Sequence, residues 1–84
     1  MTELKKYATG TVIKRLRKEK GLSQEVLSGF AGIARSQLSM IESGEKQANF
    51  DTIWKISNAL GLEPHKLVKM IEDESLESYY LYKG

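Results

Sequence analysis

Apolar residues recur every three or four positions along most of the chain, which is the spacing of one face of an α-helix. Glycines at positions 21, 32, 44 and 61 divide this pattern into five segments. The chain has no strictly alternating apolar and polar runs and no Asn-Gly or Asp-Gly pairs, so it lacks the signals of strands and tight hairpins. The pattern predicts an all-α protein, a compact bundle of five short helices.

The first three helices are expected to end at about Lys20, just before Gly32 and at about Ser43. The first begins near Thr9 or as early as Thr2, two alternatives that stay open because a glycine at position 10 weakens its middle. Ser23 is an N-cap type of residue for the second helix. The third is expected over about residues 35–43.

Asn49 is expected to cap a fourth helix. The apolar positions expected on its buried side are Phe50, Ile53, Ile56, Ala59 and Leu60. A fifth helix starts at Pro64, because proline at the first helical position loses no hydrogen bond. Beyond Asp73 the pattern leaves a further turn, an extended arm and disorder as alternatives. The expected divisions are an N-terminal arm or helix extension (1–8), a globular domain (9–73) and a C-terminal tail (74–84).

Length and composition restrict the chemistry that the chain can carry. Its 84 residues make one domain with one small core. It has no cysteine and a single histidine, His65, so we expect no metal site, no cofactor and no small-molecule ligand. No catalytic combination of side chains is visible, so we expect a protein that is not an enzyme. With no apolar run of membrane-spanning length and no signal peptide, we expect a cytoplasmic protein without a membrane partner.

The net charge of +2 is unevenly distributed. Residues 1–46 hold nine Lys/Arg and five Asp/Glu, a net +4, whereas residues 47–84 are net −2. The basic run near the end of the first expected helix is Lys14, Arg15, Arg17, Lys18 and Lys20. A basic pole would orient the molecule towards a polyanion. Taken alone, such a run is more simply interpreted as a solvated helix face.

The stretch 24–43 combines a helix, a turn with glycine at its ninth position and a second helix. Gly32 permits the positive φ that a tight helix–helix turn requires. A small side chain at Ser28 suits a close crossing of the two helices. With Leu38 and Ile41 inward, the opposite face of the second helix is left for recognition.

This stretch and its surroundings resemble the phage-repressor and Cro-like (XRE-type) family, with its lambda-repressor-like helix-turn-helix. The matching residues are Gly21-Leu22-Ser23-Gln24, Gly32-Ile33, Ser36 to Gly44 and Thr52 to Gly61. The resemblance covers about residues 9–71 in register. It implies a transcriptional regulator that binds double-stranded operator DNA as a homodimer, with the helix at about 35–43 in the major groove. Autoregulation, as in restriction–modification controller proteins, fits a chain with no room for a ligand domain.

The resemblance also assigns roles to residues. The implied base readers are Arg35, Ser36, Gln37, Ser39 and Met40. The implied phosphate contacts are Gln24, Lys46, Gln47 and Asn49. Arg17 and Glu42 are expected to form an ion pair that joins the first helix to the end of the recognition helix. For Met40, a place at the rim of the core is an equal alternative. Ala34 stands where the family commonly has a capping Ser or Thr.

Trp54, Leu67 and Met70 are candidates for the dimer interface, because large apolar side chains on a small domain often mark an interface. Trp54 covering the edge of the core is an equal alternative. A second function stays open: an antitoxin, or another interaction module of the same fold, would use the tail to bind a protein partner.

Overall fold

The computed structural model describes residues 2–83, with the side chains of residues 5–77. Five helices make up this part of the chain. They are α1 (Thr2–Glu19), α2 (Gln24–Ala31), α3 (Arg35–Ser43), α4 (Phe50–Ala59) and α5 (Pro64–Lys83). No strand occurs within residues 2–83. The predicted all-α fold and its five helices are therefore confirmed.

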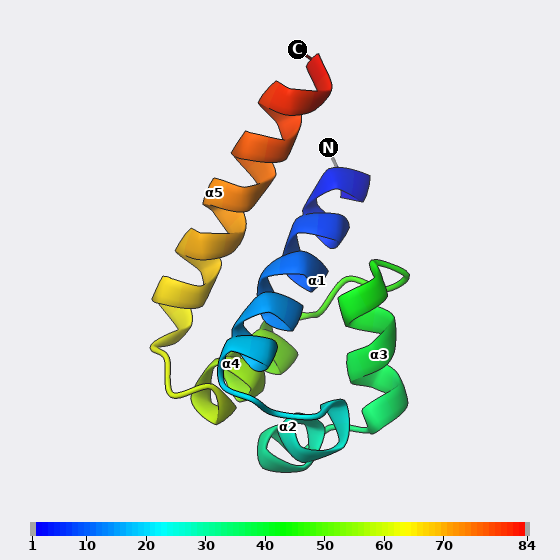
Figure 1. Cartoon of the computed structure of the whole chain (residues 1–84), viewed down its shortest axis with the longest axis vertical. Coiled ribbons are helices and arrows are strands. Elements are labelled where there is room, and N and C mark those ends of the chain that lie inside the picture. Colours follow the sequence, from blue (N-terminus) through cyan, green and yellow to red (C-terminus); the bar gives the residue numbers. More distant parts are fainter. Residues whose placement is uncertain (1, 84) are drawn as a thin grey trace.

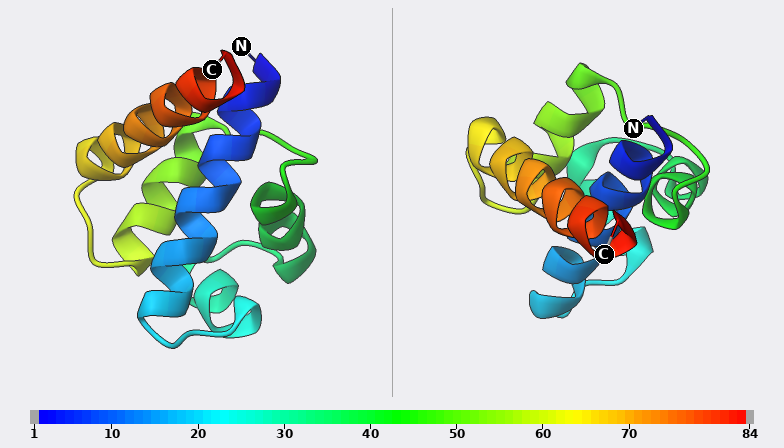
Figure 2. Two further views of the ribbon diagram at one scale, coloured as in Figure 1. Left: turned by 45° about the horizontal axis from the view of Figure 1, so that its top comes forward. Right: turned by 90° about the horizontal axis from the view of Figure 1, so that it is seen from above.

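α1 is the centre of the molecule. It lies between α5 on one side and α3 on the other, while α2 and α4 pack together at the end where α1 finishes (Figure 1). The start of α1 and the end of α5 both lie at the opposite end of the molecule (Figure 1 and Figure 2). The molecule measures 38 × 23 × 23 Å along its principal axes.

The core is assembled from apolar faces of all five helices. Its buried members are Ala8, Val12, Ile13, Leu27, Ala31, Leu38, Ile41, Ala48, Ile53, Ile56, Leu60, Leu67 and Ile71. Because α3 packs against both α1 and α2, the recognition helix of the predicted motif is fixed by packing on two sides. The core therefore holds α2 and α3 at one relative orientation.

Helix ends follow the chemistry of their capping residues. The Ser23 hydroxyl accepts a hydrogen bond from the backbone N–H of Val26 at 3.1 Å, and Asn49 Oδ1 accepts one from that of Thr52 at 2.8 Å. Ala34 precedes α3 without a side-chain cap. These caps agree with the sequence analysis.

The apolar pattern left the outer ends of the first and fifth helices open, and the structure shows the longer alternative for both. α1 begins at Thr2, which selects the earlier of the two expected starts. α5 continues from Pro64 to Lys83, so the segment from position 74 to 83 is neither an extended arm nor disordered. An ion pair between Arg15 and Glu74, at 3.0 Å, ties this part of α5 to α1.

One expected core residue is outside the core. Phe50 is 72% exposed, although it shares the apolar stripe of α4 with Ile53 and Ile56. It lies in the first turn of α4, where its ring contacts that of Trp54 with centroids 5.7 Å apart. The expectation that Phe50 is buried was therefore wrong.

Candidate nucleic-acid interface

α2 and α3 form a helix-turn-helix whose turn is built around Gly32. Gly32 has φ 71° and ψ 33°, in the left-handed region that glycine enters at no steric cost. The Ser28 side chain is buried where α2 meets the core, and its hydroxyl donates to the backbone oxygen of Glu25. Leu38 and Ile41 anchor α3 from its inner side. The turn and both anchors match the sequence prediction.

The outer face of α3 presents Arg35, Ser36 and Ser39 to solvent. These three residues and Gln24, from the first turn of α2, line a shallow surface hollow of about 400 Å³. The structure thus brings together three of the predicted base readers and one predicted phosphate contact. A guanidinium on a rigid helix beside hydroxyl groups is suited to hydrogen bonds with base edges.

The other two predicted base readers are less free. Gln37 is half-buried, and its Nε2 donates to Thr52 Oγ1 at 3.3 Å, which links α3 to α4. Met40 is half-buried at the edge of the same helix. Gln37 would have to give up its contact with Thr52 before it could bind an adenine edge.

The predicted phosphate contacts differ in whether their side chains are already hydrogen-bonded within the protein. Asn49 caps α4, and Gln47 Nε2 donates to Thr9 Oγ1 at 3.3 Å and to the Ala48 carbonyl at 3.2 Å. Lys46 is exposed in the loop between α3 and α4. Of this loop, Lys46 is therefore the side chain best placed for a phosphate.

Arg17 and Glu42 form the expected ion pair, and it is bidentate. Arg17 Nε donates to Glu42 Oε2 at 2.7 Å, and Nη2 donates to Oε1 at 2.9 Å. The two side chains are 10% and 2% exposed. The hydrogen bond with Glu42 raises the pKa of Arg17 above its ordinary value, against the opposing effect of burial. Two parallel hydrogen bonds fix both distance and orientation between α1 and α3.

The pair is extended to the start of α2. Arg17 Nη1 donates to the backbone oxygen of Leu22 at 2.7 Å, and Gln24 Nε2 donates to Glu42 Oε1 at 3.0 Å. The Gln24 side chain therefore orients the α2 N-terminus relative to α3. The backbone N–H groups of the same first turn also favour an anion, as those at any helix N-terminus do.

Gly10 is the residue whose importance the sequence analysis missed. A Cβ atom at this position would overlap the backbone oxygens of Ile41 and Glu42. The last turn of α3 therefore approaches α1 closely only because position 10 has no side chain. A glycine inside an otherwise regular helix is the available signal, but helix propensity alone indicates only a weakness of the helix at that position.

The candidate dimer residues occupy different environments. Leu67 is fully buried in the chain's own core, which removes it from any contact between subunits. Its neighbour Val68 is 46% exposed and Trp54 is 48% exposed, while Met70 is half-buried against the core. Helical phase decides the difference, because adjacent residues of a helix point about 100° apart.

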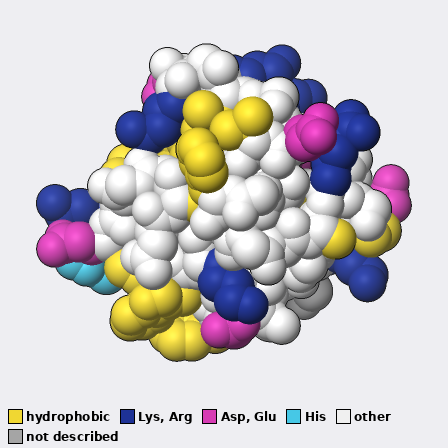
Figure 3. Space-filling model, turned by 90° about the horizontal axis from the view of Figure 1, so that it is seen from below, with side chains coloured by type: hydrophobic (Ala, Val, Ile, Leu, Met, Phe, Trp, Pro, Cys, Tyr) yellow, Lys and Arg dark blue, Asp and Glu magenta, His cyan; other side chains and the backbone are white. Residues whose placement is uncertain are grey.

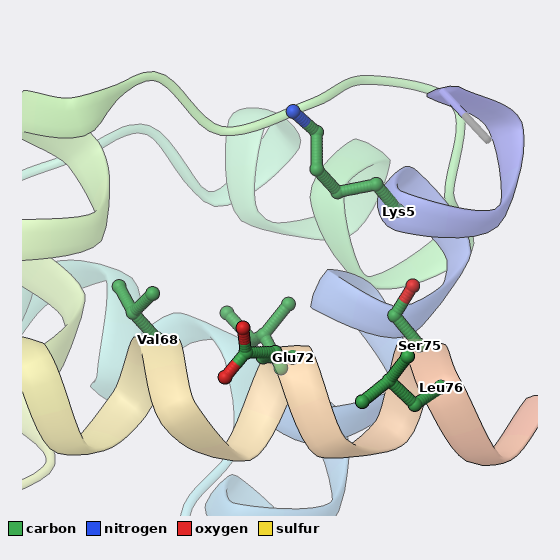
Figure 4. A pocket seen from close by; sticks show the side chains of 6 residues that line it. Lys5, Val68, Glu72, Ser75 and Leu76 are labelled. Atoms are coloured by element: carbon green, nitrogen blue, oxygen red, sulfur yellow. The ribbon is translucent and has the colours of Figure 1, made fainter.

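Val68 belongs to a mostly apolar groove between α1 and α5 (Figure 4). The groove has a volume of about 290 Å³, and its lining includes Leu76, which is 49% exposed, and Lys5 from the facing helix. Figure 3 shows the molecule from the end that carries α2, where apolar groups are interspersed with charged side chains. The groove at α5 shares no lining residue with the hollow at α3, so the two surfaces are distinct.

Among the residues described, no cluster of His, Asp and Glu is arranged to hold a metal ion. No described helix combines the length and apolar character needed to cross a bilayer.

Comparisons with known proteins agree with this geometry. A family model described as helix-turn-helix matches residues 13–67. The control protein C.MunI of Mycoplasma sp is 37% identical over 70 residues, which cover 82% of this chain and 95% of that protein. The crystal structure of the restriction–modification controller protein C.AhdI from Aeromonas hydrophila aligns with a TM-score of 0.71 and 35% identity, over 74% of this chain and 94% of that one.

A further solved structure shows a relative on DNA. The restriction–modification controller protein C.Esp1396I, crystallised as a tetramer with its natural 35-base-pair operator, aligns with a TM-score of 0.78. It is 26% identical, and the alignment covers 86% of this chain and 95% of that one. With its Gly32 turn, its Arg17–Glu42 pair and these matches, the chain belongs to the helix-turn-helix (HTH_3, XRE-type) family of DNA-binding transcriptional regulators.

Proposed function

We propose that this protein binds a specific operator as a homodimer and regulates transcription there, with α3 as its major-groove reader. The observation that carries the proposal is the rigidly held outer face of α3, where Arg35, Ser36 and Ser39 share a hollow with Gln24. A related protein, C.Esp1396I, has been crystallised in complex with its operator, which also supports the proposal.

Individual roles follow from the chemistry of each side chain. Arg35 suits a bidentate pair with guanine N7 and O6, and Ser36 and Ser39 suit a base edge or a phosphate. Met40 offers an apolar contact to a thymine methyl group. Gln37 reads a base only after it releases Thr52. These contacts provide sequence specificity.

Backbone contacts position the protein without reading sequence. Lys46 and the first-turn amides of α2 are the groups best placed to bind phosphates. Gln47 and Asn49 hold the loop in shape through their hydrogen bonds and contact phosphates with the donors that remain. The expected DNA-binding unit is residues 9–73, preceded in the sequence by residues 1–8 and followed by residues 74–84.

The homodimer is proposed to form through exposed apolar residues of α4 and α5. Trp54 and Met70 remain candidates, and Val68 replaces Leu67 because it is on the surface of the same helix. A two-fold dimer presents two copies of α3 to two half-sites of an operator. We propose further that the protein acts in the cytoplasm and binds DNA without catalysing a reaction. The simplest form of such regulation is autoregulation, in which the protein binds upstream of its own gene.

Fluorescence anisotropy tests this function directly. One labelled duplex carries the DNA upstream of the protein's own gene, and the other carries the same bases scrambled. Specific affinities are about 10³–10⁷ tighter than nonspecific ones, so a clear preference for the first duplex at two chains per site is expected. Absence of binding to either duplex at about 50 mM salt would contradict the proposal and favour the interaction module.

A further inference from the structure

A second surface hollow, of about 460 Å³, lies between α1 and the end of α3. The α1 residues that line it are Tyr7, Thr11, Lys14, Arg15 and Lys18, and α3 contributes Ser43. Lys14 and Lys18 are one helical turn apart, so their side chains share one face of α1. This hollow is the place where the basic run of the sequence meets the recognition helix.

The charge of the hollow comes from these two lysines. Arg15 is paired with Glu74 at 3.0 Å. Glu42 also borders the hollow, but its carboxylate is 2% exposed and bound by Arg17 and Gln24. No carboxylate oxygen among the described side chains lies within 4.0 Å of either lysine nitrogen. Within the described side chains of residues 5–77, two exposed ammonium groups are thus left without a carboxylate partner.

The position of the hollow connects it to the proposed DNA surface. Ser43 and Ser39 are one turn apart on α3, and Ser39 is one turn from Arg35. The Arg35 end of this face lines the first hollow, and the Ser43 end lines the second. A ligand that runs along the outer face of α3 therefore meets Lys14 and Lys18 as it passes α1.

We propose that Lys14 and Lys18 bind a phosphate of the DNA backbone, extending the contact surface from the helix-turn-helix onto α1. The inference rests on the proposed DNA binding. Lysine binds phosphate as a point charge, with no preference for the base attached to it. The two residues therefore add affinity to every sequence and add nothing to discrimination.

The test is a double variant, Lys14→Gln with Lys18→Gln, measured by anisotropy on the upstream and scrambled duplexes between about 50 and 200 mM salt. Log affinity falls with log salt, and each lost phosphate contact makes this dependence less steep by about 0.9. We expect the salt dependence to become less steep by about 0.9 on both duplexes, with the ratio of the two affinities unchanged. The thermal midpoint should not move, because both side chains are exposed.

The matched control removes the same charge elsewhere, as Lys55→Gln with Lys66→Gln. These lysines are on α4 and α5 and are paired with Asp51 and Glu63. An unchanged slope for the Lys14/Lys18 variant, while wild type binds, would overturn the inference and leave the proposed function standing. An equal fall in the control would also overturn it, as a net-charge effect. Failure of wild type to bind either duplex would overturn both.

Discussion

At the scale of single residues, Arg17 determines most directly where α3 lies. One guanidinium joins three segments: it holds both oxygens of Glu42 at the end of α3 and the carbonyl of Leu22 before α2. Burial of two charges costs desolvation energy that their attraction only partly recovers. The pair is therefore better understood as a device that fixes geometry than as a source of stability.

The expected signature of this pair is a double-mutant cycle in which the changes in unfolding free energy are not additive. Arg17→Met alone leaves the Glu42 carboxylate buried without its partner, which costs about 3–5 kcal/mol of unfolding free energy. Arg17→Met with Glu42→Gln should cost clearly less than the sum of the two single changes. Urea denaturation gives the three values. Additive effects would contradict the pairing, and Lys18→Met, an exposed change in the same turn of α1, should stay within about 0.5 kcal/mol of wild type.

At the scale of elements, helix ends and close contacts determine the shape of the motif. Gly32 and Gly44 stop α2 and α3 in left-handed conformations, with φ of 71° and 84°. Gly10 does a different job, because it lets the last turn of α3 rest against α1. The position of the recognition helix thus depends also on a residue that has no side chain, in addition to the Arg17–Glu42 pair and the core contacts.

Gly10→Ala should therefore destabilise the fold. The added methyl group meets backbone oxygens of Ile41 and Glu42, which cannot move independently of α3, and overpacking of this kind costs about 1–3 kcal/mol. Gly29→Ala is the matched control, because it is also helical and nothing lies within 4 Å of the added Cβ. That control should gain up to about 1 kcal/mol from helix propensity. Equal effects of the two changes on thermal unfolding would contradict the close approach.

The missing cap of α3 predicts a substitution that stabilises the protein, in contrast to Gly10→Ala. Ala34 has the extended backbone of an N-cap, φ −69° and ψ 144°, but no side chain that can accept a hydrogen bond. Ala34→Ser should stabilise the protein by about 0.5–2 kcal/mol, and Ser23→Ala, at the cap of α2, should lose a similar amount. Guanidinium unfolding measures both. A destabilising Ala34→Ser would show that the α3 N-terminus is not available to a cap.

Local chemistry made much of this predictable from the sequence. The caps at Ser23 and Asn49, the turn at Gly32 and the start at Pro64 depend on neighbouring residues alone, so they were predicted correctly. Whether Leu67 or Val68 faces inward depends on how α5 packs against α1, and periodicity does not resolve adjacent positions. The side-chain contacts of Gln24, Gln37 and Gln47 join segments distant in sequence, which no local pattern contains.

At the scale of the whole molecule, α1 separates two surfaces with different chemistry. α3 lies on one side of α1 and α5 on the other (Figure 1). Residues of α3 line both hollows, and residues of α5 line the apolar groove. A dimer that forms through α4 and α5 leaves both copies of α3 free for DNA. The fold therefore has room for both proposed interactions at once.

The proposed dimer contact predicts a selective loss of self-association. Trp54→Ala should raise the dimer dissociation constant by at least about tenfold, because buried tryptophans dominate many interfaces. Val68→Ser should act in the same direction. Phe30→Ala removes another exposed aromatic ring, on α2, and should leave the constant unchanged. Sedimentation equilibrium compares the three, and an unaltered constant for both Trp54→Ala and Val68→Ser would remove this surface from the dimer.

The central claim is that the outer face of α3 reads base sequence, and one measurement tests it most directly. It is the ratio of affinities for the upstream and scrambled duplexes, in wild type and in Arg35→Ala at a single salt concentration. If Arg35 binds a guanine edge, the variant loses about 1–3 kcal/mol on the upstream duplex beyond its loss on the scrambled one. An equal loss on both duplexes would show that Arg35 contacts only the backbone and would contradict the claim.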